Sequence, residues 1–87
     1  MVRAVMMTKE QIAGLVDTAR RDDKLWSALK DREINQFRED GSPKRPSLAQ
    51  LVHDFAKQQY GPEHTFDIGS LIIQIRYNTR KELGLPV

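Results

Sequence analysis

The sequence contains no cysteine, which excludes a disulfide framework, a cysteine-ligated zinc site and thiol catalysis. It has no uninterrupted run of about 18 apolar residues, so we expect no membrane-spanning segment. We recognise no secretory signal and no lipidation motif, and therefore expect a cytoplasmic protein. The five glycines are dispersed along the chain and form no phosphate-binding loop.

Groups that could carry out catalysis are few. The two histidines, His53 and His64, lie eleven positions apart and match no metal-binding spacing. The four serines lack the flanking glycines of a nucleophile elbow. We therefore expect no enzyme activity, no metal and no cofactor.

The length of 87 residues allows one small domain, which buries about 60% of the surface that its unfolded chain exposes. We expect a flexible N-terminal extension over residues 1–7, a single helical domain over 8–84 and a short tail over 85–87. Such a small domain often gains stability from a partner, and a homodimer is one option.

Two helical patterns occupy the first half of the chain. Thr8 and Gln11 form a capping box ahead of a stripe with helical spacing over residues 12–19. Asp22 and Asp23 could cap a new helix. The sequence therefore allows two alternatives, a break near residue 21 or one continuous helix. The second stripe comprises Leu25, Trp26, Leu29, Ile34 and Phe37.

A break follows at residues 41–46, where Gly41 suits a helix end and Pro43 and Pro46 prevent a regular helix. Ser47 then caps a third helix over residues 48–60, which ends at Gly61 and Pro62. We expect the large aromatic side chains to form the core, and these are Trp26, Phe37, Phe55 and Phe66.

The last segment fits two secondary structures. Helical spacing relates Ile68, Leu71, Ile72, Ile75, Thr79 and Leu83, with Gly84 as a stop signal. The same residues also alternate as in a β-strand, which would place a hairpin turn at Gly69 and Ser70. The preferred fold is all-α, with three or four helices and a helix-turn-helix-like C-terminal half. The alternative is an α+β fold with a C-terminal β-hairpin wing.

The small net charge of +2 is unevenly distributed. Residues 1–40 hold eight basic and eight acidic residues, whereas residues 41–87 hold six basic and four acidic ones. No acid occurs between Ile68 and Lys81. On a helix, Gln74, Asn78 and Lys81 share one face, and such side chains can contact base edges and phosphates.

These features predict a small DNA-binding protein, specifically a transcriptional regulator that reads double-stranded DNA with its C-terminal helix. Lys44, Arg45, Arg76, Arg80 and Lys81 would contact phosphates, whereas Gln74, Asn78 and Tyr77 would contact base edges.

The alternative is a non-enzymatic protein-interaction module, an adaptor or inhibitor of a larger partner, with an origin in a mobile element as one option. Ile73 and Tyr77 favour it, because on a helix they lie four residues apart and off the inner stripe. An exposed apolar pair at this spacing indicates a contact with another chain.

Overall fold

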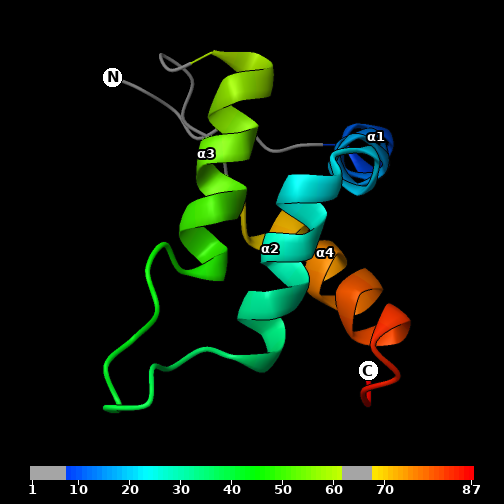
Figure 1. Ribbon diagram of the computed structural model, residues 1–87. Coiled ribbons are helices and arrows are strands. Elements are labelled where there is room, and N and C mark those ends of the chain that lie inside the picture. Colours follow the sequence, from blue (N-terminus) through cyan, green and yellow to red (C-terminus); the bar gives the residue numbers. More distant parts are fainter. Residues whose placement is uncertain (1–7, 62–67) are drawn as a thin grey trace.

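The computed structural model describes residues 8–61 and 68–87, which form four helices. These are α1 (Lys9–Arg21), α2 (Asp23–Ile34), α3 (Leu48–Tyr60) and α4 (Gly69–Glu82). Figure 1 shows α2 lying between α3 on one side and α1 and α4 on the other. The all-α prediction is confirmed for these residues. The β-hairpin wing is wrong, because Gly69 and Ser70 begin a helix.

The break between the first two helices falls at Asp22, which settles the question that the sequence left open. The Asp22 backbone is extended, with φ −90° and ψ 95°, and its side chain accepts a hydrogen bond from the Leu25 amide at 3.1 Å. At the other end of α1, the predicted capping box of Thr8 and Gln11 is present in both directions. The starts of α1 and α2 therefore each have a local polar cause.

The second helix ends earlier than its apolar pattern predicts. It stops at Ile34, and the following segment folds back so that Arg38 donates from its amide to the Ser42 carbonyl at 2.8 Å. Gly41 permits this turn with a φ of 88°, and so it does not follow a helix end as predicted. Because the helix stops, Phe37 is 62% exposed, and its assignment to the core is wrong.

The third helix begins and ends as expected. The Ser47 hydroxyl accepts a hydrogen bond from the Gln50 amide at 3.2 Å, and Gly61 follows the helix with a φ of 99°. The predicted flexible extension at residues 1–7 and the segment 62–67 lie outside the described residues. The latter contains His64, Phe66 and most of the turn on which a helix-turn-helix prediction depends.

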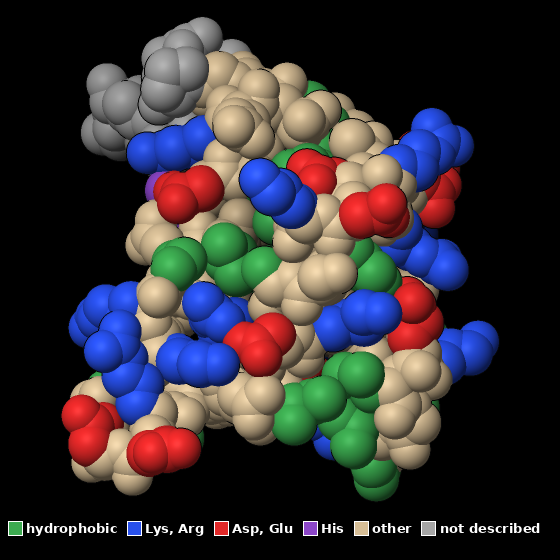
Figure 2. Space-filling view, in the orientation of Figure 1, with side chains coloured by type: hydrophobic (Ala, Val, Ile, Leu, Met, Phe, Trp, Pro, Cys, Tyr) green, Lys and Arg blue, Asp and Glu red, His purple; other side chains and the backbone are tan. Residues whose placement is uncertain are grey.

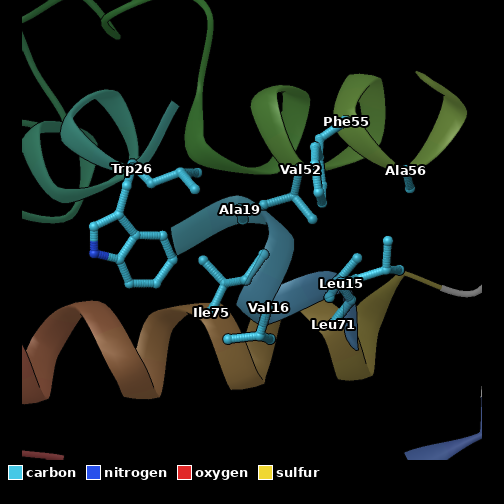
Figure 3. Close-up of a cluster of buried hydrophobic side chains, with 10 residues drawn as sticks. Leu15, Val16, Ala19, Trp26, Val52, Phe55, Ala56, Leu71 and Ile75 are labelled. Carbon is cyan, nitrogen blue, oxygen red and sulfur yellow. The ribbon is translucent and has the colours of Figure 1, made fainter. Parts of the chain in front are cut away.

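The core lies between the four helices, and each of them contributes to it (Figure 3). Trp26 and Phe55 are buried as predicted, at 6% and 5% exposure. The Trp26 indole nitrogen donates to the Glu82 carboxylate at 2.8 Å, which joins the start of α2 to the end of α4. The buried hydrophobic residues are Leu15, Val16, Ala19, Trp26, Leu29, Val52, Phe55, Ala56, Leu71 and Ile75.

Candidate interaction surface on the fourth helix

Helix α4 presents four different sides to its surroundings. Leu71, Ile75 and Thr79 face the core and are fully buried, which confirms the helical spacing of this segment. Since successive residues are about 100° apart, the remaining positions point in three other directions. Arg76 and Arg80 face α2, Gln74 and Asn78 lie beside α1, and Ile73, Tyr77 and Lys81 are exposed.

The two α4 arginines hold a carboxylate of the second helix. The Glu33 side chain is only 1% exposed, although it lies near the C-terminal end of α2. Arg76 donates to it from Nε at 3.1 Å and from Nη2 at 3.2 Å, and Arg80 donates from Nη1 at 2.8 Å. A buried carboxylate requires such partners, so these contacts are part of the domain's internal structure.

The electrostatics of this cluster follow from its geometry. Burial alone would raise the pKa of Glu33, but hydrogen bonds from Arg76 and Arg80 outweigh it and lower the pKa below the usual 4.5. The hydrogen bond to Glu33 and its negative charge raise the pKa of Arg76. Arg80 also donates from Nε to the Pro86 carbonyl at 2.7 Å, which holds the C-terminal tail against α4.

A second cluster surrounds Asp31, which also lies near the C-terminal end of α2. Lys44 donates from Nζ to the Asp31 carboxylate at 3.0 Å, and Arg32 also pairs with it. A hydrogen bond from Asn35 and then one from Lys44 lower the pKa of Asp31. Arg45 is exposed and forms no ion pair within residues 8–61 and 68–87.

The two amide side chains of the predicted recognition face are directed toward α1. Asn78 donates from Nδ2 to the backbone carbonyl of Gln74 at 2.8 Å. Both residues line a hollow of about 530 Å³ whose opposite wall is α1, including Ile12 and Val16. The structure therefore separates this amide pair from the arginines with which the sequence pattern had grouped it.

Apolar side chains are exposed on the outward side of α4. Ile73 is 65% exposed and Tyr77 is 47% exposed, which confirms their predicted exposure. The cation of Lys81 lies four residues beyond Tyr77 and has no ion pair within the described part of the chain. This side of α4, defined by Ile73, Tyr77 and Lys81, is called the outer face below.

The sequence reasoning missed three other exposed hydrophobic residues. Ile34 is 57% exposed at the end of α2, Phe37 is 62% exposed in the following turn, and Val87 is 73% exposed. Figure 2 shows hydrophobic side chains gathered near the C terminus, at the lower right. The polar sequence from Asn35 onward could have indicated an early end of α2, since Asn and Asp compete with helical hydrogen bonding.

The described residues form no arrangement suited to a metal ion. Among residues 8–61 and 68–87, no three His, Asp or Glu side chains group together. His53 lies 3.9 Å from the carboxylate of Asp54, its neighbour on α3, and is partly exposed. In the same ranges, no helix is long and apolar enough to cross a membrane.

Comparison with known proteins gives no family assignment. No protein-family model matches the chain, and neither the curated proteins nor the solved structures contain a match. A function for the chain must therefore be argued from its own side chains.

Proposed function

We propose that this chain is a non-enzymatic protein-interaction module that binds a partner protein through the outer face of α4. The observation that carries the proposal is the exposure of Ile73 and Tyr77 on a helix whose other apolar residues are packed. The isoleucine and tyrosine are one helical turn apart, which is the spacing at which a helix inserts two anchors into an apolar groove. Tyrosine is also enriched among the residues that dominate binding energy in interfaces.

Charge supports a partner with an acidic surface. No acidic residue lies between residues 68 and 81, whereas Lys81 is exposed and the Arg76 side chain is 48% exposed. A second copy of the chain would bring the same cations toward each other around the twofold axis. The homodimer of the sequence prediction is therefore less favoured than a different protein with acids around an apolar site.

The DNA-binding hypothesis stays a prediction, but the ion pairs weigh against it. Three of its five phosphate contacts, Lys44, Arg76 and Arg80, share two carboxylates of the chain, Asp31 and Glu33, which reduce the net positive charge that these side chains present to a phosphate. Arg45 and Lys81 are the two that have no ion pair among the described residues. A smaller net positive charge means less counterion release, which supplies a large share of the affinity for duplex DNA.

Photo-cross-linking in the native host tests the proposal. Tyr77 is replaced by a photoreactive phenylalanine analogue, and the matched control places the same analogue at Lys24, which is exposed on α2. We expect one discrete protein adduct from position 77 and none from position 24. The adduct should disappear when Ile73→Asp is added, because a charge at a 65% exposed position disrupts an apolar contact without unfolding the helix.

Three results would contradict the proposal. Equal adducts from positions 77 and 24 would mean that the outer face has no special affinity. An adduct of two copies of the chain would favour the homodimer. An adduct that a nuclease removes would favour DNA as the partner.

A further inference from the structure

A hollow beside the outer face combines apolar walls with an excess of positive charge. It has a volume of about 310 Å³ and lies among the end of α2, the turn that follows, the start of α3 and the middle of α4. This volume is at the lower end of the range for ligand sites, so it fits one or two side chains. The residues that matter here, which define the basic groove, are Arg32, Phe37, Lys44, Leu48, Ile72 and Arg76.

The basic groove and the outer face lie on neighbouring sides of α4. Ile72 and Arg76 line the groove, and each is followed directly in sequence by a residue of the outer face, Ile73 and Tyr77. One extended segment of a partner can therefore contact both surfaces of α4.

The charge of the groove follows from its ion pairs. Arg32 and Lys44 share the carboxylate of Asp31, whereas Arg76 and Arg80 share that of Glu33. Four cations thus face two carboxylates, which leaves two positive charges uncompensated within these clusters. Figure 2 shows Lys and Arg side chains gathered over the connection between α2 and α3.

The cations of the groove also retain hydrogen-bonding capacity. Lys44 has three donors and uses one of them on Asp31, and its side chain is 32% exposed. Arg76 uses Nε and Nη2 on Glu33, which leaves its Nη1 group free among the described contacts. An incoming carboxylate can accept from these donors without breaking the internal ion pairs.

The apolar walls of the groove require an occupant with an apolar side chain. Leu48 and Ile72 are partly buried at the groove, and Phe37 stands 62% exposed at its edge. An aromatic or branched aliphatic side chain would cover this surface and remove it from water. A purely ionic ligand would leave it exposed.

We infer that the basic groove binds an acidic peptide segment of a partner protein, with one large apolar side chain as its anchor. The anchor contacts Phe37, Leu48 and Ile72, while flanking carboxylates contact Lys44 and Arg76. The inference rests on the proposed function, because it names the chemistry of the partner that would also cover the outer face.

Peptide titration of the full chain, followed by NMR, tests the inference. The probe is a synthetic peptide of about eight residues with a Phe-Leu centre flanked by glutamates, whose extended length is about 28 Å. Two matched peptides replace the glutamates by lysines, or the Phe-Leu centre by serines. We expect saturable shifts of the Phe37, Lys44 and Ile72 amides with the first peptide, and at least about tenfold weaker binding with the other two.

Two variants locate the binding site on the protein. Lys44→Glu should weaken binding at least about tenfold, and Lys24→Glu, the same charge change outside the groove, should change it less than about twofold. Because Lys44→Glu also faces Asp31, Phe37→Ser provides a second variant at an exposed position where folding is unaffected. It should weaken binding without changing the thermal unfolding midpoint.

Several outcomes would overturn the inference. The first two are binding of the lysine peptide, or of the serine peptide, as tight as that of the glutamate peptide. The other two are an equal loss of affinity from Lys44→Glu and Lys24→Glu, and the absence of saturable shifts at the groove. Its failure is distinct from that of the proposed function, since cross-linking from Tyr77 would still identify a partner on the outer face. Conversely, peptide binding without that adduct would support the groove alone.

Discussion

Glu33→Gln is the substitution that most directly tests how α2 and α4 are joined. The side chain keeps its shape, but it loses its charge and one of its two acceptor oxygens. In the wild type, Oε1 accepts from Arg76 and Arg80 and Oε2 accepts from Arg76. In the variant, the amide NH₂ group must face a guanidinium, so at least one hydrogen bond is lost and the others become weaker.

The expected loss is about 2 kcal/mol in the free energy of unfolding. A hydrogen bond with a charged partner contributes about 1.5–3 kcal/mol, and removing one member of a fully buried ion pair costs about 3–5 kcal/mol. The lower figure applies here because the Arg76 and Arg80 side chains are 48% and 31% exposed and water can solvate them. For a domain of this size, such a loss lowers the thermal midpoint by about 8–16 °C.

Urea and thermal unfolding followed by circular dichroism measure this loss, with Glu39→Gln as the control. Glu39 is exposed in the turn after α2 and has no ion pair among the described residues, so its change should be within about 0.5 kcal/mol. Equal stability of the Glu33→Gln and Glu39→Gln variants would refute the structural role assigned to the buried carboxylate.

Three further predictions concern the same fold. Because the folded-state pKa of Glu33 is lowered from 4.5, its contribution to stability is complete above about pH 4.5 and is lost as the pH falls through the folded value. Below pH 4.5, the free energy of unfolding should therefore change less with pH for Glu33→Gln than for the wild type, as measured by acid titration. Ile75→Ala should lower stability by about 2–5 kcal/mol and Ile73→Ala by less than about 0.5 kcal/mol in the same unfolding assay, since the first is fully buried and the second 65% exposed; equal losses would contradict the assigned faces of α4. Trp26→Phe removes the 2.8 Å hydrogen bond to Glu82 and should cost at least about 1 kcal/mol, whereas a neutral result by chemical denaturation would mean that this contact adds nothing.

Local polar patterns predicted where most helices begin and end. Thr8, Asp22 and Ser47 each have a side-chain oxygen that accepts an amide hydrogen bond three residues later, and the sequence indicated all three. The reason is that a cap involves neighbours within one turn, so its energetics are contained in a short stretch of sequence. Whether Asp22 broke the chain into two helices depended on packing between α1 and α2, which such a stretch does not contain.

The ion pairs of α4 could not be predicted from the sequence because their partners lie far apart along the chain. Arg76 and Arg80 were interpreted as phosphate contacts, yet their partner Glu33 lies 43 and 47 residues earlier in the chain. One signal was present: Glu33 falls four residues after Leu29 and seven after Trp26, so it continues the buried stripe of α2. A carboxylate on a buried stripe requires a cation, and arginines four residues apart on another helix are suited to supply it.

The acid-free stretch from Ile68 to Lys81 therefore has a different meaning in the folded chain than in the sequence. If all five predicted phosphate contacts were available, the logarithm of the DNA-binding constant would fall with the logarithm of the salt concentration with a slope of about −4.5, at about 0.9 per contact. Because the carboxylates of Asp31 and Glu33 offset two of these five charges, the three that remain would give a slope of about −2.7. The carboxylate partner of this stretch lies on α2, where Glu33 pairs with both Arg76 and Arg80 across the helix interface and offsets one of their two charges. What α4 presents outward is then chiefly its apolar pair, Ile73 and Tyr77, and an apolar pair with cations at its margin suits an acidic protein surface better than a phosphate backbone.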